Sequence, residues 1–285
     1  MLSLVVRDHV RRIREQVPPA LADEPDAVHQ LRTSVRRLRN VLAAFRRYLD
    51  RDATAELRSE LKVWGDLLGL ARDLEVRARE AATAADAVGL GETDRSPADA
   101  VTARTTDRSA LVEQLVRARS RAHADVVRWT TSDRGRALAR LLETWAAEPR
   151  LGERASRPAR KAARRAVRHE VERTLAAVGE LDDLASAHEL RKAARRLRHT
   201  CDAITRAPVG LLGRRTKHLG SAGHRIQSLL GDHRDALLLA EHVRTHTNGS
   251  PDGDAVVRLC QERALSALAD LPAALGDLEV TARSG

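Results

Sequence analysis

Two stretches of the chain place a histidine and four arginines at the same spacing. The first is HQLRTSVRRLR, from His29 to Arg39, and the second is HELRKAARRLR, from His188 to Arg198. In each, arginines stand three, seven, eight and ten residues after the histidine. Side chains of this kind could bind phosphate, because the planar guanidinium donates two parallel hydrogen bonds to phosphate oxygens. The repeated motif therefore predicts an anion-binding function.

Helical spacing separates the charged from the apolar residues of each stretch. At about 100° per residue, the histidine and the arginines at positions three, seven and ten fall within a stripe roughly 80° wide. In the first copy this stripe is His29, Arg32, Arg36 and Arg39. The inward face would hold Val28, Leu31, Val35, Leu38, Leu42 and Phe45 in the first copy, and Leu190, Ala194, Leu197, Cys201 and Ile204 in the second. Each stretch is predicted to be a helix with one basic and one buried face.

Further basic stripes follow the same helical spacing. One is Arg157, Arg160, Lys161, Arg164, Arg165 and Arg168; another is Lys217, Ser221, His224, Ser228, Gly231 and Arg234, with a thinner counterpart of Arg58, Lys62 and Arg72. Stacked arginines repel one another, so each stripe is either a solvated face or a surface that an anion neutralises. Recurrence in both halves favours the anion. The predicted binding residues are His29, Arg32, Arg36, Arg37, Arg39, Lys62, Arg72, Arg164, Arg168, His188, Arg191, Arg195, Arg196, Arg198, Lys217, His224 and Arg234.

The charge of the chain is segregated along the sequence. Fifty Lys and Arg against 40 Asp and Glu give a net charge of +10. Asp and Glu are absent from residues 27–49, 154–169 and 204–231. Such a balance predicts an acidic partner.

The scarcity of aromatic residues narrows the kind of anion. Aromatics are 2% of the chain, and Phe45, Trp64, Trp129 and Trp145 stand at positions expected in the core or at an interface. Binders of single-stranded nucleic acid usually stack bases on exposed aromatic rings, and readers of duplex DNA need a recognition helix after a short turn, a unit that we do not find. A polyanion without bases fits better, although charge alone leaves nucleic acid open.

His29 and His188 have several conceivable roles. Either could be a hydrogen-bonded histidine at a helix start, and His188, followed by Glu189, could accept a phosphoryl group. Neither belongs to a tight cluster of metal ligands, so no metal and no cofactor are expected. We favour a proton-dependent phosphate donor, because a nearby phosphate raises the imidazole pKa above its usual value near 6.5.

The composition predicts an all-α fold. Strong helix formers dominate, Gly (16) and Pro (9) are scarce, and no segment alternates apolar and polar residues, so no sheet is expected. Helices are predicted at residues 3–16 (stopped by Pro18 and Pro19), 26–49 (capped by Asp26), 55–88 (bent at Gly65 and Gly69), 98–129, 133 to before Pro149 (capped by Asp133), 158–178, 184–206, 211–243 and 254–282, with turn-rich breaks at 89–97 and 248–253.

The segment from Pro149 to Pro158 is the best internal boundary, dividing the chain into halves at residues 1–150 and 151–285. LLGLARDLEV at 67–76 matches LLGDHRDALL at 229–238, again once in each half. We expect two pseudo-symmetric four-helix bundles that arose by internal duplication. Asp73 and Asp235 are expected to orient Arg72 and Arg234 through ion pairs.

Several features bear on the location of the protein. No apolar run approaches the 18 or more residues of a membrane span, and the start of the chain does not resemble a signal peptide. Cys201 and Cys260 occupy inward helix positions and are expected to be buried thiols in a reducing cytoplasm.

The paired motif resembles the CHAD family, the conserved-histidine α-helical domain. The matching segments are VHQLRTSVRRLRNVLAAF and AHELRKAARRLRHTCDAI, followed by LGLARDLEV and LGDHRDALL, and the resemblance covers residues 1–280 approximately. It implies a two-lobed helical domain whose basic central groove, built from both halves, binds inorganic polyphosphate at polyphosphate granules. Functional residues would be His29, Arg32, Arg36, Arg39, Lys62 and Arg72, with His188, Arg191, Arg195, Arg198, His224 and Arg234.

We therefore expect a non-enzymatic polyphosphate-binding protein. Many CHAD proteins also carry a triphosphate tunnel domain with an ExExK motif, which this sequence lacks, so the chain is expected to be the binding module alone. The alternatives are a polyphosphate-processing or histidine phosphotransfer enzyme, and a non-specific nucleic-acid-binding protein. Against an enzyme, no acidic cluster suited to Mg²⁺ and no Gly-rich phosphate loop accompanies the motifs. The sequence leaves the oligomeric state and the preferred polyphosphate length open.

Overall fold

The protein is all-α in the part of the chain that the structure, a computed structural model, describes: residues 1–89, 98–178, 184–246 and 251–284. These residues form no strand, and their one β-bridge joins Leu49 to Leu151. The elements are α1 (Leu2–Leu21), α2 (Ala27–Ala44), η1 (Arg46–Tyr48), α3 (Arg51–Gly89), α4 (Ala98–Thr131), α5 (Asp133–Ala147), η2 (Glu153–Ser156), α6 (Ala159–Ala176), α7 (Leu184–Thr205), α8 (Arg214–His246), α9 (Pro251–Ala269) and α10 (Leu271–Arg283).

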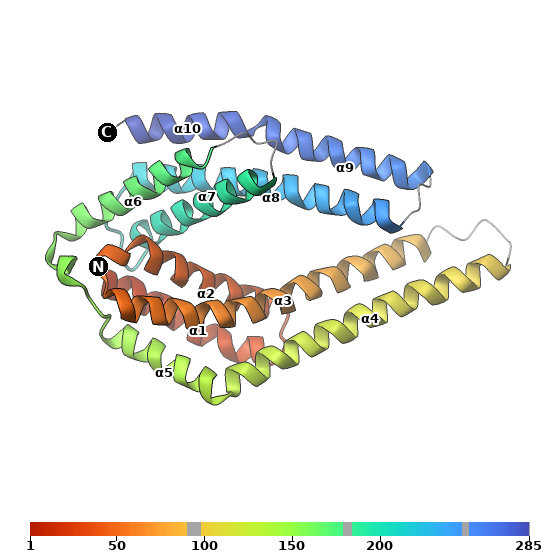
Figure 1. The fold of residues 1–285 in the computed structure, drawn as a ribbon, viewed down its shortest axis with the longest axis horizontal. Coiled ribbons are helices and arrows are strands. Elements are labelled where there is room, and N and C mark those ends of the chain that lie inside the picture. The colour runs from red at the N-terminus through yellow and green to blue at the C-terminus, as the bar shows by residue number, and fades with distance from the viewer. Residues whose placement is uncertain (90–97, 179–183, 247–250, 285) are drawn as a thin grey trace.

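The helices gather in two groups that follow the chain order (Figure 1). Helices α1–α5 pack on one another, as do α6–α10, and α2 packs against α7 where the groups meet. The long pairs α3–α4 and α8–α9 extend in the same general direction, while the chain crosses between the groups at the other end, through η2 (Figure 1). The described residues contain five α-helices in each predicted half, and not four. The division at residue 150 and the pseudo-symmetry stay predictions.

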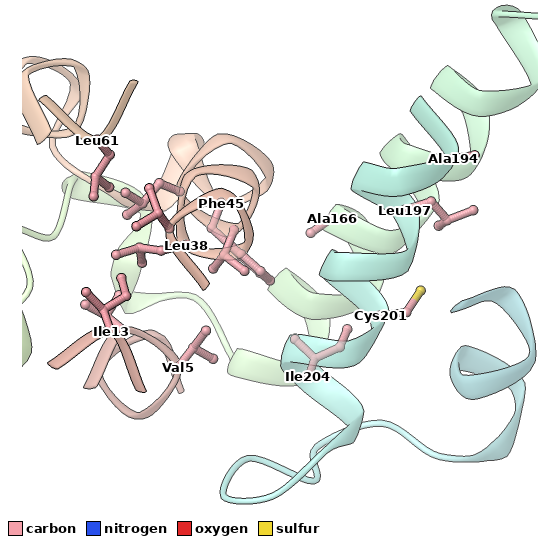
Figure 2. Close-up of a cluster of buried hydrophobic side chains, with 14 of the residues drawn as sticks. Val5, Ile13, Leu38, Phe45, Leu61, Ala166, Ala194, Leu197, Cys201 and Ile204 are labelled. Carbon is pink, nitrogen blue, oxygen red and sulfur yellow. The ribbon is translucent and has the colours of Figure 1, made fainter. Parts of the chain in front are cut away.

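One hydrophobic core runs through both groups of helices. All the residues predicted to face inward on the two repeated helices are buried, from Val28 to Phe45 on the first and from Leu190 to Ile204 on the second. Figure 2 shows side chains of both groups in this core, among them Leu38 and Phe45 on one side and Leu197 on the other. Burying these apolar faces fixes the direction of the opposite, basic faces.

Pro18 and Pro19 do not end α1, contrary to the sequence-based expectation. Each proline removes only its own N–H, while its carbonyl oxygen still accepts a hydrogen bond. The backbone N–H of Ala22 donates to the oxygen of Pro18, and that of Glu24 to the oxygen of Pro19, both at 3.0 Å. The helix therefore continues to Leu21.

The predicted helix caps also differ. Asp26 precedes α2 with a left-handed backbone (φ 60°), and its carboxylate caps no backbone N–H but accepts a hydrogen bond from Gln30 Nε2 at 2.9 Å. The cap of α5 is Ser132, whose Oγ accepts from the backbone N–H of Gly135 at 3.2 Å, and Asp133 is the first helical residue. Serine serves as well as aspartate at this position, so sequence alone did not separate the two.

Two predicted helices are shorter than expected. The first repeated helix ends at Ala44, before the turn η1, and not at Leu49. The predicted final helix is two helices, α9 ending at Ala269 and α10 beginning at Leu271. Pro272 stands in the first turn of α10, where a residue without an N–H is favoured because that N–H would have no partner within the helix.

Residues 90–97 and 248–250 of the two predicted breaks lie outside the described residues, while Pro251–Gly253 begin α9. Within the described ranges, no helix is both long and apolar enough to cross a membrane. Cys201 and Cys260 are buried free thiols, as predicted.

Candidate anion-binding site

The basic stripes of α2 and α7 converge. Burial lowers the pKa of Arg36 and of Arg195 from the usual arginine value to about 10. The largest charge effect on Arg36 comes from Arg195, across the junction of the two helices, and Arg32 and Arg191 add to it. The charges of Arg191 and Arg32 in turn lower the pKa of Arg195. We call these four residues, Arg32, Arg36, Arg191 and Arg195, the Arg cluster.

Glycines on the neighbouring helices make room for the outer arginines of the cluster. A Cβ atom at Gly69 of α3 would lie 3.5 Å from Nη2 of Arg32, and one at Gly231 of α8 would lie 3.2 Å from Nη2 of Arg191. The two glycines are the corresponding residues of the repeated LLG segments. Both arginines thus lie flat against a helix that offers no side chain at the point of contact.

Carboxylates neutralise little of the Arg cluster. Arg32 pairs with Asp73 at 3.0 Å, whereas Arg36, Arg191 and Arg195 have no ion pair in the described structure. The buried Nε atoms of these three arginines also lack a hydrogen-bond acceptor there. The cluster therefore offers donors and positive charge to a ligand.

Arg39 and Arg198 extend the cluster along α2 and α7. Burial lowers the pKa of Arg39, with Asp66 opposing and Arg58 adding to the effect, and the Nε atoms of Arg39 and Arg58 are buried without an acceptor. Arg198 Nη1 lies 3.1 Å from Nδ1 of His224, on α8. Arg39 therefore lies beside α3, and Arg198 lies beside His224 of α8. Arg58 is close to Arg39; the sequence placed it in a basic stripe but not among the predicted binding residues.

The two repeated helices meet at equivalent positions. Nδ2 of Asn40 lies 2.7 Å from Nδ1 of His199, and each residue directly follows the last arginine of its motif. Burial, together with the charges of Arg36 and Arg37, lowers the pKa of His199 well below its usual value, so the ring is neutral. A contact between counterparts is expected on a two-fold axis, which supports the predicted duplication. Sequence reasoning missed this pair because neither residue belongs to the charged stripe.

Arg37 and Arg196 face away from the stripe, about 100° further round their helices than Arg36 and Arg195. Arg37 lines a small cavity of about 40 Å³ that also contains Arg12. Arg196 Nε lies 3.5 Å from a carboxylate oxygen of Glu170, which is buried in α6. That Arg37 and Arg196 contact the anion stays a prediction from the spacing of the motif. Their surroundings suit a structural role better.

His29 and His188 stand at the outer ends of the two stripes. Burial lowers the pKa of each below its usual value, and neighbouring cations, mainly Arg72 for His29 and Lys192 and Arg234 for His188, lower it further. Both rings are therefore neutral at pH 7 in the free protein. In the described part of the chain, no group of three His, Cys, Asp or Glu side chains is placed to hold a metal ion.

The remaining cations of the long helices have mixed surroundings. Lys62 pairs with Asp66 at 2.6 Å, and Arg72 pairs with Glu75 at 2.9 Å and with Asp26 at 3.3 Å. The predicted pairing of Asp73 with Arg72 is therefore wrong, since Asp73 reaches across to α2.

The predicted pairing of Arg234 with Asp235 is absent from the described ion pairs. Both side chains are exposed, as is Lys217. Adjacent helical residues point about 100° apart, which explains why the carboxylate does not reach its neighbour.

Arg164 and Arg168 lie in a different place from the Arg cluster. Both line an open hollow of about 880 Å³ between α6, η1 and the end of α2. None of the predicted residues of α2, α3, α7 or α8 lines this hollow. The structure therefore does not bring these two arginines into one surface with Arg36 and Arg195.

The profile of the CHAD domain matches residues 4–244, which include both repeated motifs and both LLG segments. The chain belongs to the CHAD family.

Two solved structures resemble the chain in fold. The crystal structure of the CHAD domain from the plant Ricinus communis matches with a TM-score of 0.62 at 23% identity, over 99% of this chain and 90% of that one. PptA from Streptomyces chartreusis matches with a TM-score of 0.61 at 21% identity, over 98% and 97%. These likenesses show the shared fold.

Two curated Mycobacterium tuberculosis proteins are similar in sequence. The uncharacterized protein Rv2226 of strain H37Rv is 30% identical over 250 residues, and the uncharacterized protein MT2285 of strain CDC 1551 is 29% identical over 250 residues. Each match covers 82% of this chain and 44% of the relative. The chain thus spans less than half the length of the curated relatives it matches.

Proposed function

We propose that this CHAD protein binds inorganic polyphosphate, without catalysing its turnover, and that the Arg cluster is the centre of the binding surface. The observation that carries the proposal is the convergence of the two arginine stripes: the charge of Arg195 opposes the charged form of Arg36, and Arg32 of α2 opposes that of Arg195. Bringing uncompensated cations together costs free energy, and a bound polyanion would offset that cost.

The chemistry of the site favours a chain of phosphates over a nucleic acid. Guanidinium groups bind phosphate oxygens in a bidentate manner. Stacking with bases would need exposed aromatic rings, but Phe45, Tyr48, Trp64 and Trp145 are buried, and the partly buried Trp129 stacks on Trp64 with ring centres 6.0 Å apart. The cluster therefore offers phosphate contacts without platforms for bases.

The histidines would add a dependence on pH. His29 and His188 are neutral in the free protein at pH 7, because burial and nearby cations lower the pKa of each. A bound phosphate would stabilise the imidazolium and raise that pKa. Binding would then take up protons and strengthen as the pH falls.

Calorimetric titration tests the proposal. Long-chain polyphosphate should bind more tightly than single-stranded DNA of equal total charge, at the same salt concentration. Equal or tighter binding of DNA would refute the preference for polyphosphate. Release of orthophosphate from polyphosphate in the presence of Mg²⁺, abolished by His188→Ala, would establish an enzyme instead of a binding protein.

We further propose that polyphosphate binding locates the protein at polyphosphate granules. A fluorescent fusion should coincide with the granules in cells and become diffuse when Arg36 and Arg195 are both replaced by alanine. A fusion that stays at the granules after this change would separate localisation from the Arg cluster.

A further inference from the structure

The hollow beside α6 has an unusual balance of charge. Eight Lys or Arg side chains and His169 line it, against one carboxylate, that of Glu172. We call this surface the α6 basin. One wall is formed by α6, which contributes Arg160, Arg164 and Arg168, and the other by Arg46 and Arg47 of η1.

The cations of the α6 basin are unpaired, unlike many arginines on the rest of the surface. Elsewhere arginines commonly meet a carboxylate one helical turn away, as Arg11 meets Glu15 at 2.7 Å and Arg283 meets Glu279 at 3.0 Å. None of the eight Lys or Arg residues of the basin has an ion pair within the described ranges. Arg164 and Arg168 are exposed and stand at i and i+4, where like charges repel.

The basic surface of α6 also continues beyond the basin. Arg160, Arg164 and Arg168 also line a second hollow of about 720 Å³, together with Arg214 and Arg215 at the start of α8. Such a concentration of unpaired cations in concave surfaces raises the local potential and attracts multivalent anions.

The basin adjoins the end of α2, because Ala43 and Ala44 line it, and Arg39 stands one helical turn before Ala43 on the same helix. The charge of Arg58 lowers the pKa of Arg39, at the end of the α2 stripe, and also that of Arg196 of α7. The charge of Arg46, which lines the basin, also lowers the pKa of Arg196. Arg39, Arg58, Arg196 and Arg46 therefore form a series of neighbouring cations, with the carboxylate of Asp66 near Arg39 and the buried carboxylate of Glu170 near Arg196.

We propose that the α6 basin is a second phosphate-binding surface, and that one polyphosphate chain of sufficient length occupies the basin and the Arg cluster together. This inference rests on the proposed function and adds a dependence on chain length. Tripolyphosphate would occupy the Arg cluster alone. A long chain would gain affinity, because its second contact is made within the same complex at a high effective concentration.

The test compares tripolyphosphate with long-chain polyphosphate on three double variants. Arg164→Ala/Arg168→Ala should weaken binding of the long chain about tenfold, and reduce the slope of log affinity against log salt by about 1.4, if each arginine neutralises one phosphate. Binding of tripolyphosphate should not change. Arg36→Ala/Arg195→Ala should weaken binding of both ligands. The control Arg258→Ala/Arg263→Ala, on the exposed surface of α9, should weaken binding of neither.

The possible outcomes separate this inference from the proposed function. Failure of the wild-type protein to bind either ligand would overturn the proposed function. Weaker binding in the Arg36/Arg195 variant alone would overturn the α6 basin and leave the function standing. An equal loss of both ligands in the Arg164/Arg168 variant would indicate a long-range effect of charge, and would also overturn the inference.

A double variant in η1, the other wall of the basin, tests whether the loss of long-chain binding comes only from a local change in α6. Arg46→Ala/Arg47→Ala should reproduce the selective loss of long-chain binding, and circular dichroism should show unchanged helix content in both. Long-chain binding within twofold of wild type in this variant would contradict a two-walled phosphate site.

Discussion

Replacing Arg36 with methionine should stabilise the free protein. The change removes a charge that burial disfavours and that Arg195 opposes, and it keeps a long apolar stem in place. Lowering the pKa of Arg36 from its usual value to about 10 corresponds to roughly 3 kcal/mol. The side chain is partly exposed, and solvent screens part of this cost, so we expect a gain on the order of 1 kcal/mol in the free energy of unfolding.

The sign of this effect follows from the charge state at neutral pH. Arginine is charged in both the folded and the unfolded protein below pH 10, so the destabilisation by Arg36 is fully present at pH 7. It is relieved only as the pH rises above about 10. The gain from Arg36→Met should therefore be constant across the neutral range.

Thermal and urea unfolding, followed by far-UV circular dichroism at low salt, measure the gain. For a domain of this size, 1 kcal/mol raises Tm by about 2 to 4 °C. Added salt should stabilise the wild type more than the variant, because it screens the repulsion that the variant has lost. Combining Arg36→Met with Arg195→Met should give less than the sum of the single gains, since each removes the same repulsion.

Arg32→Met is the matched control. Arg32 lies in the same cluster but pairs with Asp73 at 3.0 Å, so its replacement leaves a carboxylate without its partner. We expect no stabilisation from this change. A lower Tm for Arg36→Met, or equal gains from Arg36→Met and Arg32→Met, would refute the conclusion that uncompensated repulsion at Arg36 opposes folding.

Three further predictions concern packing and pH. Gly223→Ala should lower the free energy of unfolding by about 2 kcal/mol, because its Cβ would lie 2.9 Å from a backbone oxygen of α7. Gly276→Ala has open space around its Cβ and should raise the free energy of unfolding by about 0.5 to 1 kcal/mol. His199 is neutral when folded and takes a proton when unfolded below its usual pKa of 6.5, so stability should fall as the pH falls below that value, by up to about 1.4 kcal/mol per pH unit; His199→Asn should make this fall shallower. Polyphosphate affinity should rise as the pH falls from about 8 to about 6, and the double variant His29→Gln/His188→Gln should lose that rise.

Each of these has an outcome that would contradict it. Equal unfolding midpoints for the two glycine variants would show that α7 and α8 do not approach as closely as described. An unchanged pH slope in the His199 variant would assign the acid sensitivity to other groups. A flat affinity profile in the wild type would remove His29 and His188 from binding.

Periodicity in the sequence predicted much of the fold, since the hydrophobic effect acts on the same residues that define the pattern. The inward residues of the two repeated helices, such as Leu31 and Leu197, are buried as predicted. The family was identified from the repeated motif, and the profile match confirms it. Helix ends were less predictable, because Pro18 removes one hydrogen bond without preventing its neighbours from forming theirs.

Contacts between helices could not be predicted in the same way. Spacing places Arg36 and Arg164 each on a basic face, but does not say which element that face meets. In the structure Arg36 lies near Arg195, whereas Arg164 lies across a hollow from η1. Likewise, Asp73 pairs with Arg32 of another helix and not with its neighbour in sequence. These arrangements depend on how the helices cross, which a local pattern does not encode.

The most direct test of the central proposal is the affinity of the wild-type protein and of Arg36→Ala/Arg195→Ala for long-chain polyphosphate, measured by calorimetry at one salt concentration. We expect the double variant to bind at least about tenfold more weakly, as the loss of two charged hydrogen-bond donors implies, while remaining folded. Undiminished binding by the folded variant would show that the convergence of α2 and α7 is not the polyphosphate site.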